Sequence, residues 1–278
     1  MTENIKDKIR DFWTKYPCAC NILPFEEGSR EFFDCHDQAI DRLTPYHNDI
    51  YRYEQVRGKR VLEVGCGMGS HAWRFARYAL EFQAIDLAPK SIELTKKRFV
   101  LHNLDSSGIT LGDAEKLNFP DNYFDFVYSN GVIHHSPNTS KAVEEIYRVL
   151  KPGGKTIVMI YNKKSIFYLF TLMFMGQSKY ALIKLMPQAL FKRISHDVAL
   201  KEFLDRTPWR NLSDIVLRFS DGHFNPYTKI YTTQQALRLF GTFRNVHIEL
   251  RNSRDILFSN VDLLNRHFGW ALFIHAEK

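Results

Sequence analysis

The sequence predicts an α/β domain built on a doubly wound, mostly parallel sheet. Short apolar runs at residues 60–64, 82–86, 109–113, 124–128 and 155–161 have the length and composition of buried strands. Segments with apolar residues at helical spacing separate these runs, as in successive βαβ units. The first run leads through a glycine-rich turn into a helical segment, which is how a nucleotide-binding unit of this class begins.

The glycine-rich turn decides which kind of nucleotide is expected. Gly65, Gly67 and Gly69 follow the first strand, and each glycine lets the backbone turn sharply or approach a ligand. A dinucleotide fingerprint, G-x-G-x-x-G, requires a glycine at position 70, where this chain has Ser70. We therefore do not expect a dinucleotide at this turn.

The second and third strands end in carboxylates. Asp86 lies 21 residues after Gly65, where a carboxylate can accept hydrogen bonds from both hydroxyls of a ribose. The alternative is that Asp86 only caps the helix that begins near Pro89. Asp113 closes the third strand, where a carboxylate can accept from an adenine amino group while Ala114 donates its backbone N–H.

The second half of the predicted domain continues the alternation. Residues 140–150 form an amphipathic helix that Pro152, Gly153 and Gly154 are expected to end, and the fifth strand begins at Lys155. A further helix begins near residue 232, and residues 245–250 and 270–275 suit two final strands.

Four motifs in this order resemble the class I S-adenosylmethionine-dependent methyltransferase family: VLEVGCGMGS, AIDLAP, GDAEKLNFPDNYFDFVYSNGVIHH and EIYRVLKPGG. The resemblance covers about residues 58–161. It implies a seven-stranded Rossmann-like sheet with an antiparallel last strand, and S-adenosylmethionine as the cofactor. It implies that the cofactor-binding residues are Glu63, Gly65, Cys66, Gly67, Gly69, Asp86, Leu87, Asp113, Ala114 and Asn130, with Asn130 beside the methionyl group.

Two histidines follow the fourth strand, at the edge of the sheet where an acceptor would meet the methyl group. One of His134 and His135 is the candidate catalytic base, because the pKa of an imidazole is near neutral. The alternative is that both histidines bond to the backbone and stabilise the turn before residues 136–140. A hydroxyl or phenol acceptor benefits from a positioned base, whereas alignment can suffice for a thiol, amine or carbanion-like acceptor.

Four regions are expected along the chain: an N-terminal helical cap at 1–57, the cofactor-binding core at 58–161, an inserted helical lid at 162–230, and the completion of the sheet at 231–278. The net charge is +7, and the insertion alone holds 11 Lys/Arg against 5 Asp/Glu. Two interpretations of the insertion stay open. It is either a lid that covers the pocket or an element that lies on an anionic membrane surface, although Pro187 interrupts its second helix.

The end of the insertion supplies further candidate residues. We assign Tyr161, His223, Asn225 and Tyr227 to the acceptor, with a purely structural turn at 221–227 as the alternative. The phrases YNKKS and HFNPYTKIYT resemble a bacterial branch of the family with an inserted lid. Cys18, Cys20 and Cys35 are expected to be reduced thiols. No histidine or fourth cysteine lies at matching spacing, so no metal is assigned.

These observations lead to a methyltransferase that acts on a small, partly apolar acceptor. Within enzymes, the alternatives are a lipid or quinone-like acceptor at a membrane surface and a metalloid bound by the three N-terminal cysteines. Outside enzymes, the alternative is a non-catalytic binding module. No signal peptide or spanning segment is expected, which predicts a cytoplasmic protein with a possible peripheral position at the inner membrane surface. No nucleic-acid partner is expected.

Overall fold

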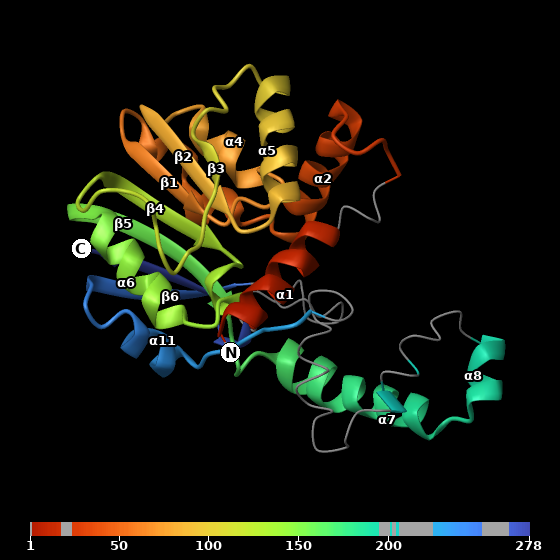
Figure 1. The fold of residues 1–278 in the computed structure, drawn as a ribbon. Helices are drawn as coiled ribbons and strands as arrows, with labels where there is room; N and C mark the ends of the chain where they lie inside the picture. The colour runs from red at the N-terminus through yellow and green to blue at the C-terminus, as the bar shows by residue number, and fades with distance from the viewer. Residues whose placement is uncertain (1, 18–23, 195–200, 202–203, 206–224, 252–266) are drawn as a thin grey trace.

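A computed structural model describes residues 2–17, 24–194, 201, 204–205, 225–251 and 267–278. Within these ranges the core is one seven-stranded sheet in the order β3-β2-β1-β4-β5-β7-β6 (Figure 1). The strands are β1 (Arg60–Val64), β2 (Glu81–Asp86), β3 (Ile109–Leu111), β4 (Phe124–Asn130), β5 (Leu150–Tyr161), β6 (Arg244–Arg251) and β7 (Ala271–Glu277). β7 runs antiparallel to both of its neighbours, β5 and β6, and β1 to β5 pair in parallel. The predicted fold class is confirmed.

Helices cover both faces of the sheet. Successive side chains of a strand point to opposite faces, and because both sets are apolar in these strands, each face needs a covering layer. In β1, Leu62 and Val64 pack with α6 (Thr139–Val149) and with Phe240, directly after α11 (Thr233–Leu239). Val61 points to the other face and packs with Phe75 of α4 (Ser70–Ala76). α5 (Pro89–Leu101) completes that second layer.

The passage from α6 into β5 differs from the sequence prediction. Residues 152–154 were expected to separate the helix from a strand that starts at Lys155, but β5 already begins at Leu150. The pairing between β4 and β5 shifts register between Phe124 and Phe126, and Gly153 takes the left-handed conformation, with φ 76°. The Pro-Gly-Gly segment is therefore a bulge inside the strand rather than a loop before it.

The part of the N-terminal region that the structure describes includes the helices α1 (Thr2–Lys15), α2 (Arg30–Leu43) and α3 (His47–Tyr51) and the short 3-10 helix η2 (Tyr53–Val56). α1 and α2 both contact α5. Phe32 and Phe33 of α2 are buried against Met68 and Leu94. Arg98 is fully buried and pairs with Asp37 of α2 at 2.7 Å, so this ion pair and the apolar contacts fix α2 beside the glycine-rich turn.

The insertion after β5 starts with an apolar π-helix, η4 (Phe167–Gly176), followed by α7 (Gln177–Leu185) and α8 (Gln188–Ile194). Pro187 lies between the last two, as expected from its missing N–H. Together these helices extend away from the sheet (Figure 1). Among the described residues, no helix is both long and apolar enough to cross a membrane.

Candidate active site

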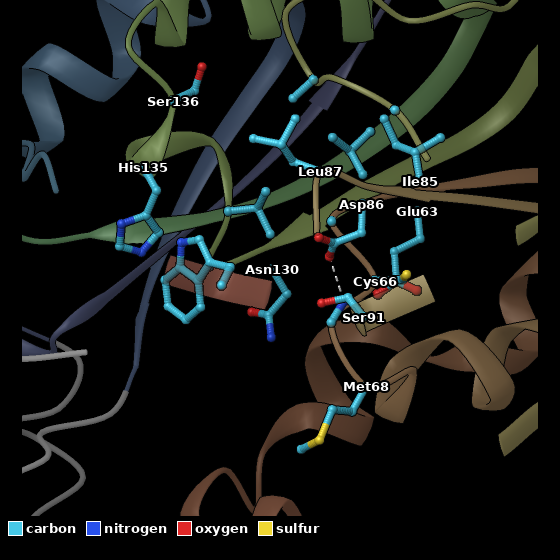
Figure 2. A pocket seen from close by; sticks show the side chains of 18 of the residues that line it. Glu63, Cys66, Met68, Ile85, Asp86, Leu87, Ser91, Asn130, His135 and Ser136 are labelled. Carbon is cyan, nitrogen blue, oxygen red and sulfur yellow. Dashed lines mark hydrogen bonds between the residues drawn. The ribbon is translucent and has the colours of Figure 1, made fainter. Parts of the chain in front are cut away.

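One pocket lies at the carboxyl ends of β1, β2 and β4 (Figure 2). It is lined by nine of the ten residues that the sequence assigned to the cofactor: Glu63, Gly65, Cys66, Gly67, Asp86, Leu87, Asp113, Ala114 and Asn130. The tenth, Gly69, is the N-cap residue of α4, at the end of the same turn. The structure thus brings together residues from four consecutive segments of the chain.

The glycine-rich turn wraps closely around the start of this pocket. Gly65, Gly67 and Gly69 all have positive φ, of 84°, 53° and 75°. A Cβ on Gly65 would overlap the side chain of Val132, which follows β4. Glycine is therefore required at position 65 both for the backbone conformation and for the space beside β4.

Asp86 ties the turn to the next helix. Its Oδ2 accepts from the backbone N–H of Gly67 and its Oδ1 from that of Ala88, both at 2.9 Å. Ser91 also donates to this carboxylate (Figure 2). Burial raises the pKa of Asp86, although these hydrogen bonds act in the opposite direction. Ala88 is the N-cap residue of α5, so Asp86 satisfies a helix-end donor and also lines the pocket.

At the far end of the pocket, Asp113 is shared between two partners. Its Oδ1 accepts from the backbone N–H of Glu115 at 2.9 Å, and its Oδ2 accepts from Nζ of Lys6 at 2.6 Å. Lys6 also pairs with the Glu115 carboxylate at 2.6 Å. Burial lowers the pKa of Lys6, but its hydrogen bonds to Asp113 and Glu115 raise it more. Lys6 stays charged and holds α1 over the end of the pocket where adenine is expected.

The cap supplies the opposite wall, with Ile9 and Trp13 from α1 and His36 and Ile40 from α2. Nδ1 of His36 lies 3.2 Å from a guanidinium nitrogen of Arg98, which can only donate. Burial, with Arg98 nearby, lowers the pKa of His36 to about 4. His36 is therefore neutral, accepts at Nδ1 and carries its proton on Nε2.

The two histidines that follow β4 have different positions. His135 lines the pocket, and its ring meets Trp13 edge-on at a centroid distance of 5.2 Å. Nδ1 of His135 lies 2.9 Å from the backbone oxygen of Tyr227, which can only accept. His134 is fully buried, packs its ring 4.0 Å from that of Tyr161, and is not among the residues that line the pocket.

Three of the predicted acceptor residues, Tyr161, Asn225 and Tyr227, are not among the residues that line the pocket. Tyr161 is buried and stacks on Trp270 at 4.4 Å. Asn225 is buried, accepts from the backbone N–H of Tyr227, and has its amide nitrogen 3.5 Å from Nδ1 of His135. The return segment thus supports His135 from behind.

The remaining predictions concern residues that the structure covers only in part. His223, Cys18 and Cys20 lie outside the described residues. Cys35 is a half-buried free thiol. Within the described ranges, no group of histidine, cysteine or acidic side chains could hold a metal ion.

Sequence reasoning missed Lys6, His36 and His71, which also line the pocket. Lys6 and His36 belong to the cap, and no local pattern indicates which face of a cap helix meets the core. His71 follows the glycine-rich turn directly, so the motif was enough to predict that this residue lies near the ligand. The role of His71 could not be predicted, because it depends on contacts made by residues 41, 47 and 53 of the cap.

Comparison with known proteins agrees with this geometry. Residues 62–158 match a family model described as a methyltransferase domain. The chain is 38% identical over 116 residues to phthiotriol/phenolphthiotriol dimycocerosates methyltransferase 1 of Mycobacterium ulcerans, covering 41% of each chain. It is 37% identical over 120 residues to a fatty-acid O-methyltransferase of Mycolicibacterium smegmatis, covering 41% of this chain and 43% of that one. The chain thus spans less than half the length of these relatives.

A solved structure extends the likeness in fold to nearly the whole chain. The PH0226 protein of Pyrococcus horikoshii superposes with a TM-score of 0.54 at 17% identity, covering 96% of this chain and 98% of that one. The glycine-rich turn and the carboxylates Asp86 and Asp113 lie within the segment that the family model matches. Residues 62–158 are thus similar to the methyltransferase domain, and this similarity implies S-adenosylmethionine as the cofactor.

Proposed function

We propose that the protein transfers a methyl group from S-adenosylmethionine to a partly apolar small molecule held between the cofactor site and the N-terminal cap. The observation that carries this proposal is the composition of the cap wall. Ile9, Trp13 and Ile40 present apolar surface to the same pocket into which Asp86 and Asn130 point from the sheet. An acceptor with an apolar body and one nucleophilic group fits between the two walls.

His135 is the candidate base at this position. Because the backbone oxygen of Tyr227 can only accept, Nδ1 of His135 carries the proton and Nε2 is the basic nitrogen of the neutral ring. When bound, the cofactor supplies a methyl group on a sulfonium, which is already a good leaving group. A hydroxyl acceptor must lose its proton as it attacks, and Nε2 of His135 takes that proton. Trp13, edge-on to the imidazole, limits the positions that the ring can adopt.

A transfer assay tests the class of acceptor. Purified protein is incubated with methyl-labelled S-adenosylmethionine and a cell extract, which is then separated into organic and aqueous fractions. We expect label in a molecule that partitions at least partly into the organic fraction. Label only in strongly polar metabolites would contradict the proposed acceptor. If no label is transferred although S-adenosylhomocysteine binds, the chain is a binding module instead.

A second candidate, a lipid acceptor met at an anionic membrane surface, is supported by the insertion. Leu169, Leu182, Leu185 and Leu190 are exposed by 55%, 63%, 72% and 47%. Residues 162–191 contain four lysines and no acidic residue, and Lys163, Lys164 and Lys179 are exposed. Exposed leucines beside exposed positive charge suit the boundary between acyl chains and anionic headgroups. The fatty-acid O-methyltransferase among the relatives is consistent with such an acceptor.

Vesicle flotation tests this second candidate. We expect the protein to float with vesicles that contain anionic lipid at low salt, and to be released as salt rises. Leu182→Ser with Leu185→Ser should abolish flotation. Leu80→Ser is the matched control, because Leu80 is 73% exposed but lies in the turn before β2. Equal flotation of the double variant and the control would contradict the membrane role.

A further inference from the structure

A line of buried polar side chains runs from the surface of the cap into the cofactor pocket. Nε2 of His47 lies 2.7 Å from Oδ1 of Asp41, and Nδ1 of His47 lies 2.9 Å from the hydroxyl of Tyr53. That hydroxyl lies 2.8 Å from Nδ1 of His71, and Nε2 of His71 lies 3.1 Å from Nδ2 of Asn130. His71 and Asn130 line the pocket, whereas the Asp41 side chain is 55% exposed.

Asp41, the first residue of this hydrogen-bonded series, determines which atom donates in each of the hydrogen bonds that follow. Asp41 also pairs with Arg74 at 2.9 Å and, as a carboxylate, can only accept, so His47 donates from Nε2. A neutral His47 must then accept at Nδ1, which makes Tyr53 the donor to it. The Tyr53 oxygen in turn accepts from Nδ1 of His71.

The hydrogen-bond directions of the last two members, His71 and Asn130, follow in the same way. Burial, together with Arg74 and His47 nearby, lowers the pKa of His71 well below its usual value, so the ring is neutral. Nε2 of a neutral His71 that donates from Nδ1 can only accept, and the NH₂ group of Asn130 supplies the donor. With its nitrogen committed to His71, the amide of Asn130 presents its oxygen to the pocket (Figure 2).

We propose that Asp41, His47, Tyr53 and His71 are positioning residues that hold the Asn130 oxygen toward the ammonium group of the cofactor's methionine moiety, and that protonation of His47 reverses the chain. This inference rests on the proposed function, since it takes S-adenosylmethionine as the ligand. An ammonium group can only donate, and it therefore needs an oxygen rather than an NH₂ group at this position.

The number of protons on His47 decides whether the direction of the hydrogen bonds reverses. A protonated His47 donates from both nitrogens, so Tyr53 must accept from it and donate to Nδ1 of His71. His71 then exchanges its Nδ1 proton for one on Nε2, with no net uptake. Asn130 must turn its oxygen to His71, which leaves its NH₂ group facing the cofactor ammonium. The only proton gained is the one that His47 takes from solvent.

The surroundings of His47 place this reversal on the acid side of neutrality. Asp41 and Asp37 face it from α2, Arg74 and His71 from α4, and Tyr53 from η2. Burial lowers the pKa of His47, Arg74 acts in the same direction, and the two aspartates oppose both. The ring is therefore neutral at pH 7.

Calorimetry with two nucleosides tests the positioning role. S-adenosylhomocysteine carries the amino-acid end, and methylthioadenosine lacks it. Tyr53→Phe removes the hydroxyl that links the two histidines but keeps the ring, which packs edge-on against Phe75 at 4.7 Å. We expect this variant to bind S-adenosylhomocysteine about tenfold more weakly, because the loss corresponds to one hydrogen bond to a charged group. Its affinity for methylthioadenosine should not change.

Tyr51→Phe is the matched control. Tyr51 is buried with its ring 4.8 Å from that of His71, and within the described residues its hydroxyl has no hydrogen-bond partner. This variant should bind both nucleosides as the wild type does. Unchanged binding of S-adenosylhomocysteine by Tyr53→Phe, or an equal loss for both nucleosides, would overturn the positioning role.

Nitrogen-15 NMR of labelled histidine reports the chain directly and needs no ligand. At pH 7.5 we expect the proton of His47 on Nε2 and that of His71 on Nδ1, and the two resonance pairs are assigned from His47→Gln. As the pH falls and His47 becomes doubly protonated, the His71 proton should move to Nε2 and S-adenosylhomocysteine should bind more weakly. The same tautomer in both rings at pH 7.5, or a His71 that keeps its Nδ1 proton after His47 titrates, refutes the inference. If neither nucleoside binds the wild type, the proposed function fails. The tautomers of His47 and His71 still show whether the hydrogen bonds run in the proposed direction.

Discussion

Replacing Asp86 separates the two roles that its carboxylate can play. Asp86→Ala leaves the N–H groups of Gly67 and Ala88 without their acceptor. Each buried unsatisfied donor costs about 1–3 kcal/mol, so the loss of two acceptors should lower the free energy of unfolding by roughly 2–6 kcal/mol. If the carboxylate also accepts from two ribose hydroxyls, at about 1.5 kcal/mol or more each, S-adenosylhomocysteine should bind at least ~100-fold more weakly.

The loss of affinity alone does not distinguish ribose binding from a disordered turn, so the assay is a double-mutant cycle. Calorimetry compares S-adenosylhomocysteine with its 2′-deoxy analogue on the wild type and on Asp86→Ala. We expect removal of the 2′-hydroxyl to weaken binding about tenfold in the wild type and hardly at all in the variant. If the hydroxyl contributes equally to both proteins, Asp86 only organises the turn and caps α5, and the ribose assignment is wrong.

The pH dependence of the same binding follows from the pKa of Asp86. Burial raises this pKa, and the ionised carboxylate accepts from two ribose hydroxyls more strongly than the protonated form, one of whose oxygens has become a donor. The affinity for S-adenosylhomocysteine should therefore be complete at neutral pH and decline on acidification, beginning at a higher pH than the ordinary aspartate pKa would give. Asp86→Asn, which carries no charge, should lose this decline.

Four further changes test other parts of the site. Lys6→Met should speed dissociation of S-adenosylhomocysteine about three- to tenfold in stopped-flow measurements, because it removes the ion pairs that hold α1 over the pocket; an unchanged rate would contradict a closing role for α1. Gly65→Ala should abolish detectable binding while circular dichroism stays native, since its Cβ would overlap Val132. His135→Gln should flatten the acid limb of the pH–rate profile for a hydroxyl acceptor, and a profile identical to the wild type would exclude it as the base. In the wild type, neutral His36 must charge on unfolding, so stability should fall as pH drops from 6.5 toward about 4, by at most ~3 kcal/mol; His36→Asn should lose this part of the decline in urea unfolding.

The sequence was sufficient for the fold because the strands of the core carry local signals. The runs at 60–64 and 124–128 are apolar, short and bounded by turn residues, and they lie on β1 and β4 as expected. The final two strands were placed within a residue or two of β6 and β7. The Pro-Gly-Gly segment was misassigned because the pairing of β5 with β4 and β7 outweighs the local preference of proline and glycine for a loop.

The site could be predicted only where it depends on the motifs themselves. The turn and the carboxylates Asp86 and Asp113 come from neighbouring strands, whose carboxyl ends meet at one edge of the sheet. The contributions of Lys6 and His36 depend on how α1 and α2 dock, and that of His71 depends on Asp41, His47 and Tyr53; a helix sequence does not specify its partner. The burial of His134 likewise follows from Tyr161 and from the return segment, which lie far along the chain.

The most direct test of the account is the stoichiometry of transfer. Purified protein, S-adenosylmethionine labelled in its methyl group and an extract containing the acceptor are sampled over time by mass spectrometry. We expect S-adenosylhomocysteine and one labelled product to appear in equal amounts, and Gly65→Ala to form neither. Bound S-adenosylmethionine that is never converted, or S-adenosylhomocysteine released without a labelled product, would contradict methyl transfer by this pocket.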